Sequence, residues 1–354
     1  MDIALVGPPL SGKSQVFQAV SGHAPGHVGG ETLAAVKVPD PRVDRLAEIM
    51  HSKRRTYATF NVLDMPGFSM ETPSQQGEFR RHLANLRNCD GLVAVVRAFE
   101  DPSVPAYRGR VDPVKDLQEL RTEFMFADLE QVANRIDRLK KQMAKPVKPQ
   151  LHEHEKREMD LLERCQKALE SDVPLSEVLH DPEEVKMVSG FQFLTQKPLL
   201  VVLNVGEAEV AKPVDKQMPY AAATINLCAK FEADLSQLTG EDQKTFLAEY
   251  GLTEPVRGRF LRACMQAIGL ISFLTVNEDE ARAWPIRKGT TALEAAGTVH
   301  TDMARGFIRA ETVTFEDLVA AKDIKTARAH GKVRLEGKEY VVKDGDVINI
   351  RFSV

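Results

Sequence analysis

The sequence has few cysteines and no long apolar run, and these absences exclude several classes of protein. Its four cysteines, Cys89, Cys165, Cys228 and Cys264, are widely spaced among 354 residues and form no C-x-x-C pair. We therefore expect reduced thiols, and neither a disulfide framework nor a zinc site. No stretch approaches roughly 18 consecutive apolar residues, and the N-terminus has no basic segment of the signal-peptide type. These absences predict a cytoplasmic protein that is neither secreted nor membrane-spanning.

The chain also lacks an excess of either charge. Lysine and arginine total 47 residues, and aspartate and glutamate total 51. This balance provides no general attraction to nucleic acid or to an anionic membrane, so contact with such a partner would need a local basic patch. The length of 354 residues is long for one domain and predicts two or three.

The clearest functional motif lies at the N-terminus. The apolar residues 1–6 predict a strand, and residues 7–14 directly after it match G-x-x-x-x-G-K-[ST], the P-loop pattern. In this motif successive backbone N–H groups surround a phosphate. Lys13 is expected to reach the β- and γ-phosphates, and the Ser14 hydroxyl is expected to bind Mg²⁺. The predicted nucleotide-binding residues here are Pro9, Leu10, Ser11, Gly12, Lys13, Ser14 and Gln15.

A second motif follows the next predicted strand, at residues 59–63. Residues 64–67 fit the D-x-x-G sequence that follows a P-loop in GTPase-type folds. Asp64 is expected to hold Mg²⁺ through water, and the Gly67 N–H is expected to contact the γ-phosphate. The position after this glycine often carries a glutamine that orients the attacking water, but this chain has Phe68 there.

The middle of the chain predicts a helical insertion. Residues 91–99 and 198–203 are continuous apolar runs, typical of strands buried on both faces of a parallel sheet. Between them, residues 123–189 are charged and helical in pattern, which predicts an antiparallel helical hairpin inserted in the nucleotide domain. Its apolar seam has the spacing of a coiled coil and comprises Leu129, Val132, Ile136, Leu139, Met143, Met159, Leu162, Cys165 and Leu169.

Basic side chains gather toward the expected tip of this hairpin, and two interpretations are open. They could form a solvated helix face, or they could contact RNA phosphates. The returning helix is acidic, so part of the charge could be neutralised across the hairpin. The basic residues are Arg135, Arg138, Lys140, Lys141, Lys145 and Lys148.

From residue 271 onward the pattern changes to short strands and turns. Strands are expected at 332–335, 340–342 and 347–350, with tight turns at 337–338 and 344–345. This pattern predicts a small separate α+β domain.

In this order, the motifs resemble those of the Obg-like ATPase family, also called YchF. The most specific stretches are residues 108–113, residues 126–130, and a tail that includes residues 282–284, 300–302, 306–311 and 342–346. The resemblance implies an α/β fold: a P-loop GTPase-like, mostly parallel sheet with an inserted antiparallel helical hairpin and a small C-terminal α+β domain of the ubiquitin-like TGS type. The corresponding boundaries are 1–122 with 190–270, 123–189, and 271–354.

The resemblance also implies further site residues. Asn204, Val205 and Glu207 occupy the place of the N-K-x-D base-recognition motif, and Cys228, Ala229 and Lys230 would form the loop behind the base. An aspartate in that motif accepts two hydrogen bonds from guanine, and replacing it by glutamate should weaken that fork. The family accordingly prefers ATP, and its hydrophobic residue at the Phe68 position implies slow hydrolysis by another route.

Three departures from the family pattern stand out. Leu10 replaces an asparagine, and Ser11 replaces a valine. In switch I, ungapped counting places Val28 at the usual threonine, whereas Thr32 would be the Mg²⁺ ligand only with a shift. Residues 69–78 replace a glycine-rich switch II, so they have less backbone freedom.

Three functions follow. The first is Mg²⁺-dependent binding and slow hydrolysis of a purine nucleotide, with ATP favoured over GTP. The protein would act as a switch associated with the ribosome or another RNA assembly. Lys13 and Gly67 would be catalytic. The alternative is a non-hydrolysing nucleotide-binding scaffold that uses the arm and TGS domain to bind RNA or protein. A P-loop kinase would leave residues 64–67 and 204–207 unexplained. The motifs imply no membrane partner and no particular oligomeric state.

Overall fold

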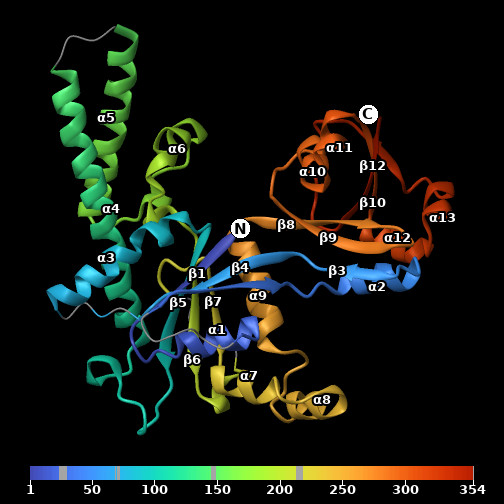
Figure 1. The fold of residues 1–354 in the computed structure, drawn as a ribbon, viewed down its shortest axis with the longest axis horizontal. Coiled ribbons are helices and arrows are strands. Elements are labelled where there is room, and N and C mark those ends of the chain that lie inside the picture. Colours follow the sequence, from blue (N-terminus) through green and yellow to red (C-terminus); the bar gives the residue numbers. More distant parts are fainter. Residues whose placement is uncertain (24–29, 68, 70–71, 145–148, 213–217, 354) are drawn as a thin grey trace. The chain divides into compact units, whose positions relative to one another are not determined.

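The computed structural model describes residues 1–23, 30–67, 69, 72–144, 149–212 and 218–353 (Figure 1). The chain forms two compact units, Met1–Ala34 with Asn61–Arg257 and Ala35–Phe60 with Gly258–Val354. It passes between them within β2 (Thr32–Lys37), β4 (Thr59–Asp64) and α9 (Val256–Ala267). The three domains expected from the sequence remain a prediction. None of the described helices is long and apolar enough to cross a lipid bilayer.

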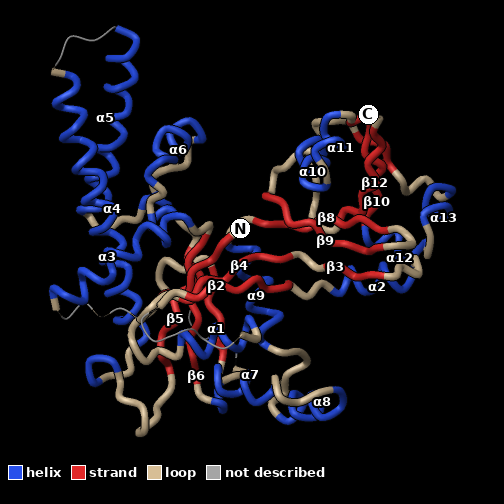
Figure 2. Tube along the Cα trace, in the orientation of Figure 1, coloured by secondary structure: helices blue, strands red, loops and turns tan. Residues whose placement is uncertain are grey.

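The first unit is built on a six-stranded sheet in the order β2-β4-β1-β5-β6-β7. Figure 2 shows strands in red and helices in blue. The pairs from β4 to β7 are all parallel, which confirms the predicted mostly parallel sheet. The apolar run at β5 is buried along nearly its whole length, as expected for a strand covered on both faces. Besides β2 and β4, the strands are β1 (Asp2–Val6), β5 (Gly91–Ala98), β6 (Leu199–Val205) and β7 (Ala223–Leu227).

Parallel pairing brings the carboxyl ends of these strands to one edge of the sheet. The loops after β1, β4, β5, β6 and β7 therefore meet there, as ligand-binding loops do in open α/β sheets. The described helices of this unit, besides the start of α9, are α1 (Lys13–Ser21), α3 (Pro73–Asn88), α4 (Pro113–Met143), α5 (Pro149–Glu170), α6 (Pro182–Val188), α7 (Ala229–Leu235) and α8 (Gly240–Glu249).

Helices α4 and α5 form the predicted antiparallel hairpin (Figure 1). All nine predicted seam residues lie in or against one apolar cluster, in which Val132, Leu139, Leu162 and Cys165 are fully buried. The first helix starts earlier than the expected position 123, because the Asp112 carboxylate accepts a hydrogen bond from the Lys115 N–H and caps it.

Charge is partly neutralised across the hairpin, as the acidic returning helix led us to expect. Arg135 of α4 forms an ion pair with Glu158 of α5. Its Nε and Nη2 donate to the two carboxylate oxygens of Glu158 at 2.7 and 2.8 Å. Lys145 and Lys148 lie outside the described residues.

A buried aspartate fixes the base of the arm. Asp128 is fully buried, and its carboxylate accepts hydrogen bonds from the Arg87 guanidinium of α3 and from the N–H groups of Leu194 and Thr195. The Thr195 hydroxyl donates to it as well. This network joins α3 to the arm.

The second unit contains a six-stranded sheet in the order β11-β10-β12-β8-β9-β3. Its apolar core includes Phe273, Ile286, Ala296, Ala310 and Ile348. The strands are β3 (Arg54–Thr56), β8 (Leu270–Val276), β9 (Glu280–Arg287), β10 (Phe307–Thr314), β11 (Arg334–Glu336) and β12 (Asp346–Phe352). The helices, besides most of α9, are α2 (Pro41–Ile49), α10 (Ala292–Val299), α11 (Thr301–Arg305), α12 (Phe315–Ala321) and α13 (Ile324–Ala329).

The strand expected at residues 340–342 is wrong. Val341 makes only an isolated bridge to Thr291. Tight turns on both sides leave too few residues for a ladder, and the Asp346 carboxylate accepts hydrogen bonds from the Tyr340 hydroxyl and the Lys343 N–H, which stabilise a loop instead.

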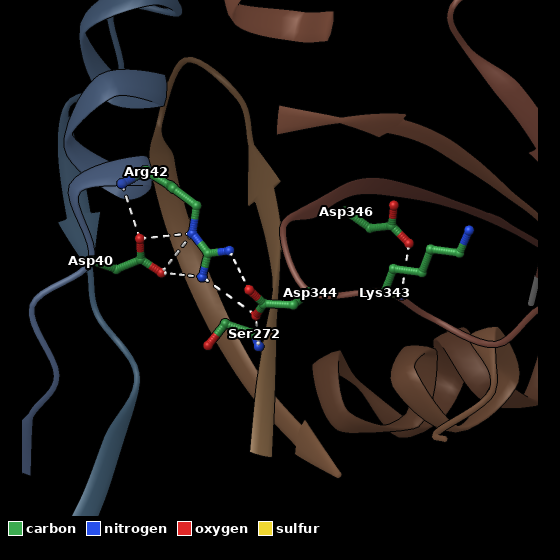
Figure 3. Close-up of polar contacts among 6 residues, drawn as sticks. All are labelled: Asp40, Arg42, Ser272, Lys343, Asp344 and Asp346. Carbon is green, nitrogen blue, oxygen red and sulfur yellow. Dashed lines mark hydrogen bonds and ion pairs between the residues drawn. The ribbon is translucent and has the colours of Figure 1, made fainter. Parts of the chain in front are cut away.

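Arg42 ties α2 to the C-terminal part of the second unit (Figure 3). Its guanidinium donates to the Asp40 carboxylate at 2.8 and 2.9 Å and to the Asp344 carboxylate at 2.8 Å. Asp344 also accepts from the Ser272 N–H at 2.8 Å. Burial alone would lower the pKa of Arg42, but the hydrogen bonds to the two carboxylates raise it above its usual value. Gly345 has a φ of 83°, and a Cβ there would lie 3.1 Å from the Arg42 Nη1.

We expect Arg42→Ala to lower the free energy of unfolding of this unit by about 1 to 2 kcal/mol, because two charge-assisted contacts are lost and Asp344 is half exposed. Urea unfolding measures the change, and hydrogen exchange at the Ser272 amide should become faster. Arg45→Ala is the matched control, since Arg45 lies on the same helix and its one ion pair among the described residues is with the exposed Glu48. Equal losses in the two variants would contradict the assignment.

Candidate nucleotide-binding site

The P-loop lies between β1 and α1, at the carboxyl edge of the parallel sheet. Its two glycines are required by close packing as well as by backbone curvature. A Cβ on Gly7 would lie 2.3 Å from the Val95 carbonyl oxygen, and a Cβ on Gly12 would lie 2.1 Å from the Asn204 Nδ2. Gly12 also has a φ of 84°, which L side chains rarely adopt. The loop therefore fits against β5 and β6 only with glycine at both positions.

Lys13 and Asp64 meet in the buried floor of this site. Their side chains are 6 and 8% exposed, and the Lys13 Nζ lies 3.8 Å from the Asp64 Oδ1. Burial lowers the pKa of Lys13 and raises the pKa of Asp64, and each shift is partly offset by the opposite charge. Neither the Asp64 Oδ1 nor the Ser11 Oγ has a hydrogen-bond partner in the described part of the chain. Buried polar atoms without partners are costly in a finished core, and they mark a place where a ligand can complete the contacts.

The donors at this point fit Mg²⁺. The buried Asp64 carboxylate and the Ser14 hydroxyl, whose hydrogen bond lowers the pKa of Asp64, both offer hard oxygen ligands. No group of three or more His, Cys, Asp or Glu suited to a metal occurs among the described residues. Mg²⁺ does not need such a cage, because it commonly takes one or two protein oxygens and completes its octahedron with water and substrate phosphates.

Asn204 joins the two halves of the site. It is 3% exposed at the end of β6, its Nδ2 donates to the Ser11 carbonyl at 3.0 Å, and its Oδ1 accepts from the Ala229 N–H at 3.1 Å. The side chain predicted to recognise the base thus holds the P-loop to the loop after β7. An amide retains one further donor hydrogen and one further acceptor lone pair, so base contact by Asn204 stays a prediction.

A cavity of about 400 Å³ opens beside Asn204. Five residues predicted for the base site line it, namely Asn204, Val205, Glu207, Cys228 and Lys230, together with the predicted phosphate-loop neighbour Gln15. Its other lining residues are Phe99, Glu100, Asp101, Val104 and Gly206.

Glu207 is held in place within this cavity. Its carboxylate lies 2.8 Å from the Lys230 Nζ and accepts a hydrogen bond from the Tyr250 hydroxyl at 3.3 Å. The hydrogen bond to Lys230 lowers the pKa of Glu207, so the side chain is ionised at neutral pH. Both of its oxygens therefore already have donors from the protein.

The sequence motifs did not include the residues between Phe99 and Val104. One signal could have identified them, because they directly follow a fully buried parallel strand, and the carboxyl ends of such strands share one edge.

The switch regions are only partly defined by the structure. Gly67 lies beside the P-loop, since a Cβ on it would be 3.1 Å from the Pro9 Cα. Thr32 begins β2, and the preceding Glu31 bonds to His82 and Asn85 of α3. Val28 and Phe68 lie outside the described residues. Much of the segment that replaces the glycine-rich switch II forms the start of α3, where Thr72 and Gln75 make a reciprocal cap.

Leu10 adopts the left-handed backbone conformation, with a φ of 60°, and its side chain is 53% exposed. Asparagine tolerates this conformation better than leucine does, which gives a physical reason for the asparagine that the family resemblance places here. The substitution to leucine therefore stores strain in the P-loop.

Replacing Leu10 by asparagine is expected to raise the free energy of unfolding by about 0.5 to 1 kcal/mol, because the left-handed conformation costs less with asparagine. Urea unfolding of the nucleotide-free protein measures this. Leu10→Ala is the control, since it removes the exposed apolar side chain but keeps the strained Cβ. An equal gain from alanine would show that exposure, and not backbone strain, is the cause.

Comparisons with known proteins agree with this geometry. A family model described as "50S ribosome-binding GTPase" matches residues 2–141, and the YchF-GTPase_C model, described as "Protein of unknown function (DUF933)", matches residues 270–353. The ribosome-binding ATPase YchF of Bacillus subtilis is 38% identical over 99% of this chain and 98% of its own length. Obg-like ATPase 1 of Oryza sativa is 33% identical over 100% of this chain and 92% of its own.

The fold agrees as well. A solved structure, that of the Schizosaccharomyces pombe YchF GTPase, matches with a TM-score of 0.84 at 26% identity and covers 99% of this chain and 97% of that one. The relatives at 38 and 33% identity match essentially from end to end, so the likeness includes the arm and the C-terminal region as well as the P-loop. The chain belongs to the YchF, or Obg-like ATPase, family.

Proposed function

We propose that this protein binds ATP together with Mg²⁺, hydrolyses it slowly and acts as a ribosome-associated switch. The observation that carries the proposal is the buried Lys13–Asp64 pair beneath a P-loop, next to a cavity of about 400 Å³ at the same sheet edge. A phosphate chain in the loop would bring the nucleoside toward that cavity. The names of the relatives, ribosome-binding ATPase and Obg-like ATPase, support both the nucleotide and the partner.

The residues of the site would have different roles in phosphoryl transfer. The Lys13 ammonium and the backbone N–H groups around Gly12 and Gly67 would stabilise charge on the γ-phosphate as water attacks. Asp64 and Ser14 would hold Mg²⁺, which when bound supplies positive charge to the β- and γ-phosphates. Phe68 cannot orient the attacking water as a glutamine would, and slow turnover follows from that difference.

Base choice follows from the state of Glu207. A guanine would donate from N1 and N2 to a carboxylate with available oxygens. In this chain Lys230 and Tyr250 already occupy the Glu207 carboxylate, so a guanine would have to displace them. Adenine has no such pair of donors, so its binding does not depend on available oxygens of Glu207. ATP is therefore the preferred nucleotide.

The arm supplies a surface suited to RNA. Arg138, Lys140 and Lys141 are exposed on α4 and form no ion pair with another described residue, in contrast to Arg135. Cations that are not neutralised by the protein can bind phosphates and release counterions.

The non-hydrolysing scaffold remains the second candidate because of one observation, the reciprocally capped start of α3 in the switch II segment. A capped helix start has less conformational freedom than a glycine-rich loop. Such a protein would bind nucleotide without turning it over.

The nucleotide proposal is tested by calorimetric titration with ATP and GTP analogues in Mg²⁺, followed by phosphate release from ATP. We expect tighter binding of ATP than of GTP and a slow release that Lys13→Ala abolishes, because the lysine contacts the transferred phosphate. Lys167→Ala, an exposed lysine on α5, is the control. Binding with turnover no higher than that of Lys13→Ala would favour the scaffold, and no binding of either nucleotide would refute both functions.

The ribosome proposal has a separate test. The triple variant Arg138→Glu, Lys140→Glu and Lys141→Glu should reduce co-sedimentation with ribosomes at least tenfold and flatten its salt dependence by roughly one unit of slope per lost phosphate contact. Lys167→Glu, toward the other end of the arm, is the matched control. Unchanged binding by the triple variant would assign these side chains to the solvated face.

A further inference from the structure

One wall of the cavity beside Asn204, called the base cavity below, was not predicted by any sequence motif. Phe99, Glu100, Asp101 and Val104 line it, and all four lie in the loop that follows β5. Loops at this edge usually owe their shape to their own turns. This one contains such a turn, because the Val104 N–H donates to the Asp101 carbonyl at 3.1 Å and the Asp101 carboxylate accepts from the N–H and hydroxyl of Ser103.

A buried arginine holds the same loop from within. Arg97 is the penultimate residue of β5 and is 4% exposed. Its Nε donates to the Phe99 carbonyl at 3.0 Å, its Nη1 to the Val104 and Pro105 carbonyls at 3.0 and 3.1 Å, and its Nη2 to the Asp101 carbonyl at 3.3 Å. The guanidinium carbon also lies 4.4 Å from the centre of the Phe99 ring.

Burying Arg97 has a free-energy cost, and the contacts that offset it define the shape of the loop. Burial of a charge is expensive, and no carboxylate forms an ion pair with Arg97 within the described ranges. Four backbone carbonyls from one short loop compensate instead, and they use the planar fork of donors that arginine has and lysine lacks. The interactions therefore fix the positions of main-chain atoms in residues 99–105, and they fix the Phe99 ring at the cavity.

We propose that Arg97 is a positioning residue for nucleoside binding: by holding the loop after β5, it shapes the wall of the base cavity. The inference rests on the proposed function, since it assigns the cavity to the base of the bound nucleotide. Within the described part of the chain Arg97 forms no hydrogen bond or ion pair with Lys13 or Asp64, so its contribution goes to the nucleoside and not to the phosphates. A wall fixed before binding lowers the conformational entropy lost when the base enters.

The test compares two ligands that share the phosphates but not the nucleoside. Binding of a non-hydrolysable ATP analogue and of inorganic tripolyphosphate, each with Mg²⁺, is measured by calorimetry for the full-length protein and for Arg97→Lys. We expect the variant to bind the ATP analogue about tenfold more weakly and tripolyphosphate within about twofold of the original, because only the nucleoside wall is loosened. In steady state the KM for ATP should rise while kcat changes little.

Arg121→Lys is the matched control. Arg121 is also a buried arginine of the first unit, at 8% exposure, but it contacts Asp172 and the Tyr220 ring and does not line the base cavity. Its lysine variant should leave the ratio of the two affinities unchanged. Ser103→Ala is a second, milder variant in case Arg97→Lys does not fold, since it removes a hydroxyl that bonds to Asp101 in the same turn. It should lower the affinity for the ATP analogue by about twofold to threefold and leave the affinity for tripolyphosphate unchanged.

The outcomes separate the two claims. An equal loss of affinity for both ligands in Arg97→Lys, or an unchanged affinity for the ATP analogue, would overturn the positioning role. Either result would leave the proposed nucleotide binding intact. A selective loss in Arg121→Lys of the same size would also overturn the positioning role, because general loosening of the unit would then explain the effect. Failure of the original protein to bind either ligand would refute the proposed function, and the inference would fall with it.

Discussion

The contact between Gly12 and Asn204 is the constraint on which the site depends. The glycine backbone approaches so closely that a Cβ would lie 2.1 Å from the Asn204 amide, whose hydrogen bonds reach Ser11 on one side and Ala229 on the other. One buried amide thereby joins the phosphate loop to the loop after β7, beside the cavity.

Around this constraint the molecule departs from ordinary packing rules in several places at once. A strained leucine occupies a left-handed position, a lysine and an aspartate are buried with an imperfect contact, and two buried oxygens have no partner in the described part of the chain. In the arm, apolar side chains line the seam, and the buried Asp128 has donors for its carboxylate. Such local costs at this sheet edge are expected where a site must be ready for a ligand.

Much of the fold was predictable because burial leaves a periodic trace in the sequence. The run at β5 and the seam from Leu129 to Leu169 report burial directly, and both were predicted. The phosphate loop was predicted from its motif. The wall held by Arg97 was not, because its hydrogen bonds end on backbone carbonyls, which any residue can supply. The grouping of Ala35–Phe60 with the C-terminal residues was also missed, since it depends on pairs such as Arg42 and Asp344, which are 302 positions apart.

That last pair has a consequence for how the protein is made. A ribosome adds about 5 to 20 residues per second, so Asp344 follows Arg42 out of the ribosome by roughly 15 to 60 seconds, given the 302 positions between them. When α2 has just been synthesised, β8 and β12 of its unit have not yet been made, and β12 follows only after Asp344. Residues 35–60 are therefore made long before most of the unit to which they belong. The second unit can close only near the end of translation, when its last strand arrives.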